Sequence, residues 1–260
     1  MTESTVSKWV NAWSFFAATY AASWLVWLPA ILRHSRAPNL ALVVLGACMP
    51  SLVGILFTHL TEDREGRRDF WRRVVEPRRI GLRWGAVILM IFPLAYGASG
   101  LAFELLGGDL LDPTDIWAQL SSPVLLGQLV LANLIISGFS EELGWRGFAL
   151  DRLQRRWGAL TASLALGLGH ALWHTPLFLI PGISQGKMGL FSLDHFLFLF
   201  MVPMGAVIMT LVYNNTRRSI LSAILLHCFQ NLCLDLVSGL QGALPTGYCA
   251  LLAGAIGLLA

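Results

Sequence analysis

Seven long stretches of this chain contain no Lys, Arg, Asp or Glu, and this feature restricts the possible folds more than any other. The charge-free stretches are residues 9–32, 39–60, 85–103, 122–140, 159–180, 196–213 and 219–234. About 20 apolar residues in a helix cross the ~30 Å hydrocarbon core of a bilayer. In that core only helices and closed barrels satisfy every backbone hydrogen bond, and these stretches lack the alternation of barrel strands. The sequence therefore predicts an all-α, polytopic transmembrane helical bundle.

A shorter apolar stretch, residues 248–260, predicts a short or truncated eighth helix, so we expect seven to eight spans. No linker, low-complexity tract or repeat interrupts the chain, which predicts a single integral membrane domain over residues 1–260. The first apolar stretch is longer than the apolar region of a cleaved signal peptide and has no clear cleavage site. We therefore expect it to remain as a signal anchor.

The basic residues concentrate in alternate connections between the apolar stretches. Residues 61–84 hold eight Arg, and residues 151–158 and 214–218 add three and two, whereas residues 107–121 carry three Asp and residues 181–195 hold a single Lys. Because cytoplasmic loops collect Lys and Arg, we expect a cytoplasmic N-terminus. The expected location is a bacterial or archaeal plasma membrane. Three aromatic residues, Phe70, Trp71 and Trp84, are interspersed among the Arg residues of the first loop. Next to membrane spans this pattern favours an anionic lipid surface, and no nucleic-acid partner is expected.

Ionisable side chains are costly inside a membrane and usually mark a functional site. Three clusters of polar residues interrupt or follow the apolar stretches: Ser140-Glu-Glu-Leu-Gly-Trp-Arg146, His170-Ala-Leu-Trp-His174 and His227-Cys-Phe-Gln-Asn231. Residues four apart share one face of a helix, which pairs His170 with His174 and His227 with Asn231. The same spacing predicts an ion pair between Glu142 and Arg146, which leaves Glu141 directed elsewhere.

Distances from the basic turns indicate that the three clusters lie at one depth. Glu141 precedes the centre of the basic Arg155–Gly158 turn by about 16 residues and His174 follows that centre by about 17, which is ~24 Å of helix on each side. His227 lies about 11 residues beyond the centre of the basic connection 214–218, which holds Arg217 and Arg218, and can reach a similar depth. We therefore expect a core site formed by the fourth, fifth and seventh spans, with Glu141 and His174 within roughly 3–6 Å of each other.

Such a set of side chains suits hydrolysis of an amide. A carboxylate with an imidazole can orient and deprotonate water, and an imidazole with a carboxamide can donate hydrogen bonds to an oxyanion. No Ser or Cys lies in an evident nucleophile motif, so direct attack by water is favoured. Asp235 continues the His227–Asn231 face by another four residues. It is a candidate supporting residue, although a solvated position near the span end explains it equally well.

In order, separation and membrane context, these motifs resemble the CAAX-prenyl-protease-type or abortive-infection (CPBP) family of intramembrane metalloproteases, over roughly residues 122–240. The resemblance implies an endopeptidase core in which Glu141 and His174 activate water while His227 and Asn231 stabilise the oxyanion. It also implies a site that opens to the cytoplasmic side, as for members that trim prenylated proteins. Some bacterial members act in bacteriocin maturation or immunity. This chain departs from the pattern at His170, where many members have Phe.

The residues leave several alternatives open. If the site holds zinc, Glu141, His174 and His227 are the expected ligands, and the spacing of His170 and His174 also suits helical zinc ligands. Hydrolysis without a metal explains the same residues. The expected partners are the lipid bilayer and a membrane-associated peptide or protein substrate, lipidated or bacteriocin-like. The alternative functions are a non-catalytic scaffold or immunity protein of the same fold, which the intact motifs disfavour, and a small proton-coupled transporter, which the absence of an evident inverted repeat disfavours.

Overall fold

The computed structural model describes residues 10–33, 37–105 and 114–238. Within these ranges the secondary structure is helical, without strands, and the predicted all-α bundle is confirmed. In chain order the elements are α2 (Ala12–Leu32), α3 (Leu40–Ala47), α4 (Met49–Thr61), α5 (Arg64–Val75), η1 (Pro77–Arg79), α6 (Gly81–Leu105), α7 (Thr114–Ser121), α8 (Pro123–Asn133), η2 (Leu134–Phe139), α9 (Ser140–Gly144), η3 (Trp145–Leu150), α10 (Asp151–Gln154), α11 (Ala159–Trp173), η4 (Thr175–Leu179), α12 (Ser184–Met188), α13 (Leu193–Asn215) and α14 (Ile220–Ser238).

Several helices are long and apolar enough to cross a membrane. In the described part of the chain there are five such helical segments: Ala12–Leu32, Leu40–Thr61, Gly81–Ala98, Pro123–Gln154 and Leu193–Asn215. The fifth and seventh predicted spans are shorter, because α11 has 15 residues and the apolar part of α14 covers Ile220–Leu236. The eighth predicted segment, residues 248–260, lies outside the described residues. The count of seven to eight spans therefore stays a prediction.

Large apolar side chains point outward from the long helices. The most exposed of them include Leu25, Leu82, Leu94, Val124 and Leu131, each with more than half of its surface exposed. A soluble protein rarely exposes contiguous apolar surface on this scale, whereas a bilayer provides the apolar surroundings that such side chains require. The outer surface therefore agrees with an integral multi-pass membrane protein.

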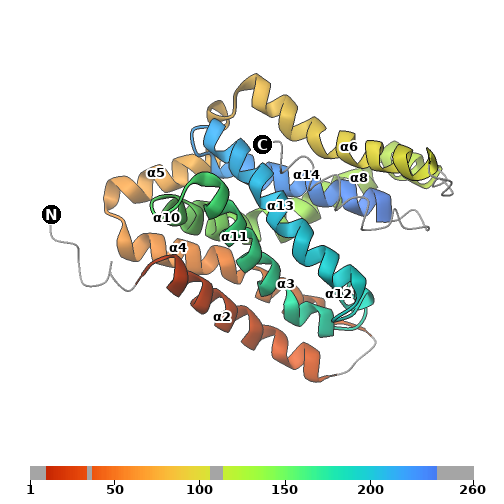
Figure 1. Cartoon of the computed structure of the whole chain (residues 1–260), viewed down its shortest axis with the longest axis horizontal. Coiled ribbons are helices and arrows are strands. Elements are labelled where there is room, and N and C mark those ends of the chain that lie inside the picture. The colour runs from red at the N-terminus through yellow and green to blue at the C-terminus, as the bar shows by residue number, and fades with distance from the viewer. Residues whose placement is uncertain (1–9, 34–36, 106–113, 239–260) are drawn as a thin grey trace.

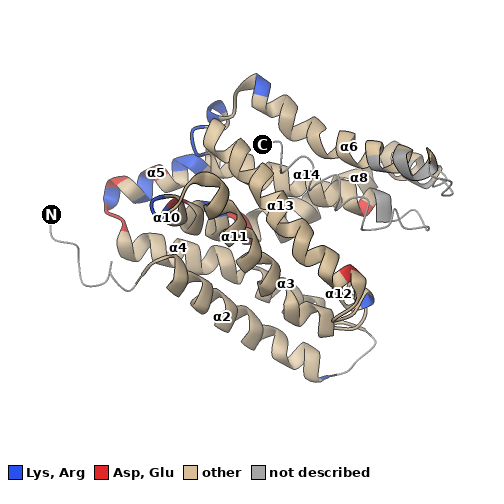
Figure 2. Ribbon diagram, in the orientation of Figure 1, with Lys and Arg blue, Asp and Glu red and all other residues tan. Residues whose placement is uncertain are grey.

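The helices are arranged around a central column (Figure 1). This column consists of α8, η2, α9, η3 and α10, and it contacts α4 on one side and α14 on the other. Helix α2 packs against α4, α6 packs against α14, and α11 packs against α13. Helix α5 crosses the end of the bundle between α4 and α6, where Figure 2 shows most of the Lys and Arg residues. One end of the bundle is thus strongly basic.

The central column extends beyond the predicted span at 122–140 and continues to Gln154. Two π-helical turns, η2 and η3, lie on either side of α9, the short helix that carries Glu141 and Glu142. A π-helical turn inserts an additional residue into an α-helix and occurs frequently at functional sites. Relative to a regular α-helix, the two turns therefore change the direction in which the side chains just before and just after the acidic pair point.

Two glycines bring α9 into direct contact with α4. A Cβ atom at Gly144 would lie 2.1 Å from the carbonyl oxygen of Pro50, and one at Gly54 would lie 2.5 Å from the Cα of Gly144. Both obstacles are backbone atoms, so rotation of a side chain does not relieve them. Only glycine at these positions permits this close packing, which fixes the acidic pair against a neighbouring helix.

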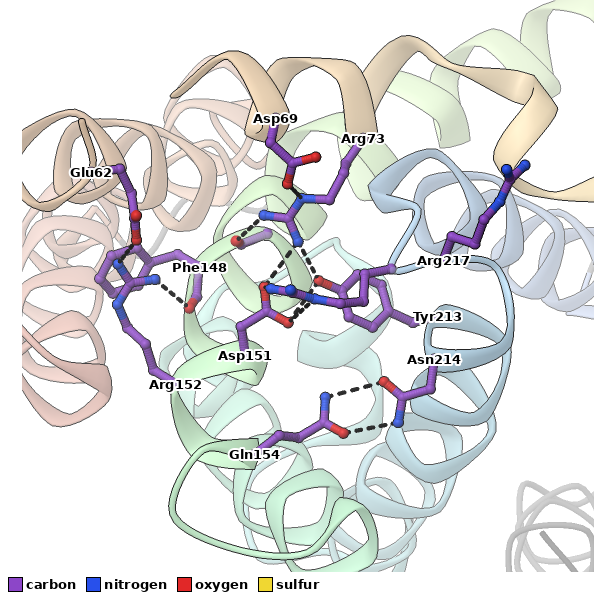
Figure 3. Close-up of polar contacts among 12 residues, drawn as sticks. Glu62, Asp69, Arg73, Phe148, Asp151, Arg152, Gln154, Tyr213, Asn214 and Arg217 are labelled. Atoms are coloured by element: carbon purple, nitrogen blue, oxygen red, sulfur yellow. Dashed lines mark hydrogen bonds and ion pairs between the residues drawn. The ribbon is translucent and has the colours of Figure 1, made fainter. Parts of the chain in front are cut away.

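A buried cluster around Asp151 fixes the basic end of the central column (Figure 3). Arg73 of α5 donates from Nη1 to Asp151 Oδ2 at 2.9 Å and to the Tyr213 hydroxyl at 2.7 Å, and Tyr213 donates in turn to Asp151 Oδ1 at 3.0 Å. Arg218 donates from Nε to the same oxygen at 3.0 Å, and hydrogen bonding to Asp151 raises the pKa of this guanidinium. The cluster therefore joins α5, α10, α13 and the turn before α14, and holds their ends at one level.

The fifth predicted span, residues 159–180, is interrupted close to the polar cluster. Helix α11 ends at Trp173, His174 forms its C-terminal cap, and the 3₁₀ helix η4 follows with Pro176 in its first turn. The α-helix ends close to Pro176, because proline has no N–H to continue the hydrogen-bond ladder. This ending places His174 at a helix terminus.

Candidate active site

Glu141 lies in the centre of the bundle with an imidazole as its close partner. The residue is 5% exposed, and His170 Nε2 donates to its Oε2 at 2.6 Å. The His170 ring packs against Trp145, with ring centroids 4.8 Å apart, and against His174, with centroids 4.9 Å apart. The sequence left the role of His170 open, and the structure places its ring in direct contact with the carboxylate.

His174 completes a compact group with these two residues. Its Nδ1 donates to the backbone oxygen of His170 at 3.0 Å, which leaves the Nε2 atom available for another partner. One carboxylate oxygen of Glu141 and one ring nitrogen each of His170 and His174 all lie within 4.8 Å of one another. The predicted approach of Glu141 to His174 is therefore confirmed.

Glu142 turns away from Glu141 and forms a second group with Arg146 and His227. Arg146 donates from Nη1 to both carboxylate oxygens, at 2.8 and 3.0 Å, and His227 Nδ1 donates to Oε1 at 2.7 Å. The side chains of Glu142 and Arg146 are 0% and 1% exposed. The predicted Glu142–Arg146 ion pair is confirmed, and its additional effect is to orient the His227 ring.

Asn231 lies one helical turn beyond His227 on α14. Its Nδ2 donates to the Ser137 hydroxyl of the central column at 2.8 Å, and an amide group retains a second N–H for another acceptor. The next turn of α14 carries Asp235, which accepts a hydrogen bond from Asn133 Nδ2 at 2.8 Å. Asp235 therefore ties α14 to α8, away from the Glu141 group.

These pairs form a continuous polar contact between α14 and the central column. On α14 the participating residues, His227, Asn231 and Asp235, follow a regular spacing of four. On the column their partners are Glu142, Ser137 and Asn133, with one spacing of five and one of four. The π-helical turn η2, Leu134–Phe139, overlaps the longer interval and absorbs the additional residue. Sequence reasoning missed Ser137 and Asn133 because a regular α-helix does not align them with α14.

The donor atoms of Glu141, His170 and His174 fit a metal ion. They offer a carboxylate oxygen and two imidazole nitrogens, and three protein ligands with an open fourth position are typical of catalytic zinc sites. His227 was expected in the ligand set, but in the structure its Nδ1 is held by Glu142. Within the described ranges, the group close enough to share an ion is therefore the one that contains His170.

Comparisons with known proteins agree with this geometry. The family model described as "Type II CAAX prenyl endopeptidase Rce1-like" matches residues 123–233, from the start of α8 into α14. The matched region includes all three polar motifs. Over 260 aligned residues the chain is also 28% identical to CAAX prenyl protease 2 of Methanococcus maripaludis, with 93% of this chain and 91% of the relative covered. In the region that carries all three polar motifs, the chain is therefore similar to CAAX-type prenyl endopeptidases.

Proposed function

We propose that this protein cleaves a peptide bond in a membrane-associated substrate, such as the C-terminal segment of a prenylated protein, with water activated by Glu141 and His174. The observation that carries the proposal is the buried Glu141–His170–His174 group beside the Glu142–Arg146–His227 group. The substrate class is supported by the relative from Methanococcus maripaludis, whose name is CAAX prenyl protease 2.

Water activation requires a carboxylate and an imidazole that can hold one water between them. Two hydrogen bonds of about 2.8 Å that meet at a tetrahedral angle span about 4.6 Å. A carboxylate oxygen of Glu141 and a ring nitrogen of His174 lie within 4.8 Å of each other, which is a separation that one bridging water can span. In the proposed step Glu141 accepts a proton from this water as its oxygen attacks the carbonyl carbon. The same proton then passes to the leaving amine.

The oxyanion formed by this attack requires donors on the opposite side of the carbonyl. His227 and Asn231 lie on one face of α14, and the ring of His227 is 6.1 Å from that of His170. Glu142 holds the Nδ1 side of His227, which turns Nε2 away from the carboxylate. When His227 carries both ring protons, this Nε2–H and the second N–H of Asn231 can donate to the oxyanion.

A divalent cation held by Glu141, His170 and His174 would supply Lewis acidity to a water at the same place. The protein residues still perform the remaining tasks. Glu142, itself held by Arg146, fixes the ring of His227. Ser137 fixes the side-chain amide of Asn231. The surrounding aromatic rings, including those of Trp145 and Trp173, exclude bulk water.

The proposed orientation places the site on the cytoplasmic side. Glu141 precedes Asp151 by ten residues along the central column, which is ~15 Å from the basic end. Figure 2 shows that the Arg residues gather at that end, which by the positive-inside rule faces the cytoplasm. In this orientation the N-terminus is cytoplasmic, the protein spans the plasma membrane, and a polar peptide enters from the basic end.

The test is cleavage of a defined peptide by purified protein in liposomes. A farnesylated peptide with a fluorophore and a quencher on opposite sides of the scissile bond is compared with the same peptide without the lipid. We expect cleavage of the farnesylated peptide and slower cleavage of the other. If the protein cleaves neither peptide although it is folded, the proposed activity on prenylated substrates is wrong. Equal cleavage of both would contradict the prenylated substrate class alone.

A further inference from the structure

We propose that Tyr20, Ser23 and Trp24 of α2 are positioning residues, which hold the last turn of α11 and with it the two histidines of the candidate active site. The inference rests on the proposed function and extends it to residues that precede the region matched by the family model. It starts from four side-chain hydrogen bonds that join α2, α3 and the end of α11.

The end of α11 leaves one backbone carbonyl without its usual helical partner. In a continuing α-helix the N–H of Leu177 would donate to the carbonyl of Trp173. The N–H of Leu177 instead donates to the carbonyl of His174 at 2.9 Å, where the chain enters η4. The indole N–H of Trp24 donates to the Trp173 carbonyl at 3.0 Å and replaces the missing bond. Trp24 therefore caps the helix that carries the histidines.

Tyr20 binds the same helix one turn earlier. Its hydroxyl donates to the carbonyl oxygen of Gly169. Glycine permits this close approach of α2, because a Cβ atom at Gly169 would lie 2.4 Å from Cε1 of Phe16. The ring of Tyr20 stacks on that of Trp24, with centroids 5.2 Å apart, so the two donors also support each other.

The two carbonyls that α2 binds belong to the residues immediately before the histidines. The Gly169 carbonyl is part of the peptide group that leads to His170, and the Trp173 carbonyl is part of the one that leads to His174. A hydrogen bond at each of these peptide groups restricts the backbone from which the imidazole extends. Helix α2 therefore fixes the starting point of both catalytic-site side chains.

The side chain of Trp173 makes a further connection to α2. Its indole N–H donates to Ser23 Oγ at 2.8 Å, and this hydroxyl donates in turn to the carbonyl of Gly46 in α3 at 2.8 Å. Trp173 is fully buried, and its ring centroid lies 4.6 Å from that of His174. Buried donors that lose their partners cost free energy, so these bonds keep the indole in one place. Ser23 therefore fixes the ring against which His174 packs.

The proposed reaction is sensitive to this positioning because its groups lie on different helices. Glu141 is on α9, and the two imidazoles that approach it within 4.8 Å are at the end of α11. A displacement of about 1 Å in an active site can reduce the rate by about 10²-fold. A smaller shift of the last turn of α11 should therefore lower kcat. It should leave KM nearly unchanged, because the lost interaction serves the transition state rather than substrate binding.

The experiment measures peptide cleavage and local hydrogen exchange in the full-length protein. Tyr20→Phe removes a single hydroxyl group and keeps the ring, and Trp24→Phe removes the indole N–H. The matched control is Trp13→Phe on the same helix, because Trp13 is 53% exposed and its ring packs against Trp157, before the start of α11. Kinetics use the farnesylated peptide in liposomes. Amide exchange in detergent is followed by mass spectrometry in residues 169–174 and, for comparison, in α4 and α13.

We expect kcat to fall about 10-fold in Tyr20→Phe and in Trp24→Phe, with KM within about 2-fold of the wild-type value. Amide exchange in residues 169–174 should become about 2–10-fold faster, which is the range expected for local opening after the loss of one hydrogen bond. Exchange in α4 and α13 should stay at the wild-type rate. Trp13→Phe should match the wild type in both measurements.

Unchanged kcat in both α2 variants, or unchanged exchange in residues 169–174, would overturn the positioning role. Equally accelerated exchange in α4, α13 and the end of α11 would also overturn it, because it would show a general loss of stability. If Trp24→Phe does not fold, Tyr20→Phe decides the question alone. If the wild type cleaves no peptide, the proposed function fails, whereas the exchange measurement still tests whether α2 holds the end of α11.

Discussion

The Glu142–Arg146 pair offers a quantitative test of how the bundle centre is held together. We predict that Glu142→Gln strongly destabilises the protein, because it leaves Arg146, whose side chain is 1% exposed, without its counter-ion. Removal of one partner from a buried ion pair costs about 3–5 kcal/mol. Against a typical folding free energy of about 5–15 kcal/mol, this is a large fraction of the total. Peptide cleavage should also fall, since His227 loses the carboxylate that holds its Nδ1.

The assay is chemical or thermal unfolding of the purified protein in detergent, with two further variants. Glu62→Gln is the matched control, because Glu62 pairs with Arg152 at 2.8 Å but its side chain is 32% exposed. The loss should be smaller here, on the order of 1 kcal/mol, because Glu62 is partly solvated and Arg152 keeps its bonds to Thr61 Oγ1 and the Phe148 carbonyl. In the double variant Glu142→Gln with Arg146→Met, no unpaired guanidinium remains. Its destabilisation should therefore be smaller than the sum of the two single substitutions.

Two results would refute this reasoning. One is an equal loss of stability in Glu142→Gln and Glu62→Gln, which would mean that burial does not increase the cost of losing the carboxylate. The other is strict additivity in the double variant, which would show that Glu142 and Arg146 do not depend on each other.

Three further predictions concern the basic end, the orientation and the helix packing. Asp151→Asn should lower stability by about 3–5 kcal/mol in the same unfolding assay, because the buried guanidinium of Arg73 loses this carboxylate. In a cysteine-free background, Arg68→Cys should react with an impermeant thiol reagent from the cytoplasmic side and Asp115→Cys from the opposite side. Gly144→Ala should cost about 1–3 kcal/mol or more through overpacking, whereas Gly127→Ala, where an added Cβ meets no atom within 4 Å, should be neutral or mildly stabilising.

Each of these predictions has a clear contrary outcome. Wild-type stability of the Asp151 variant would show that the cluster around it is dispensable for folding. Reversed thiol labelling would place the basic end outside the cell and overturn the cytoplasmic access route. Equal effects of the two glycine substitutions would mean that α4 and α9 are not in close contact.

The sequence predicted the fold class and the residues that meet in the centre. Charge-free apolar stretches require helices in a bilayer, and equal distances from the basic turn near Arg155 predicted the approach of Glu141 to His174. The spacing of four between Glu142 and Arg146 predicted their ion pair. These inferences depend on regular helical geometry, which holds closely enough over one turn or one hairpin.

The remaining features depend on departures from regular helices. The π-helical turn η2 brings Ser137 and Asn133 into line with α14, and the backbone hydrogen bonds that create such a turn have no periodic signature in the sequence. The end of α11 at Trp173 likewise depends on where Pro176 interrupts the hydrogen-bond ladder. The contact of His170 with Glu141 follows from the rotation of two packed helices, which residue spacing on either helix alone does not determine.

The most direct test of the proposed mechanism is cleavage of the farnesylated peptide by Glu141→Gln. The substitution keeps the size of the side chain and removes only the proton acceptor, so unfolding in detergent and helical content should stay near wild type. Loss of a general base reduces the rate by ~10²–10⁴-fold. Glu62→Gln, far from the site, should retain activity and serves as the control. The mechanism predicts that Glu141→Gln turns over the peptide at less than about a hundredth of the wild-type rate. Retention of more than about a tenth of the wild-type turnover would contradict the mechanism. The general base would then be another residue, first Glu142.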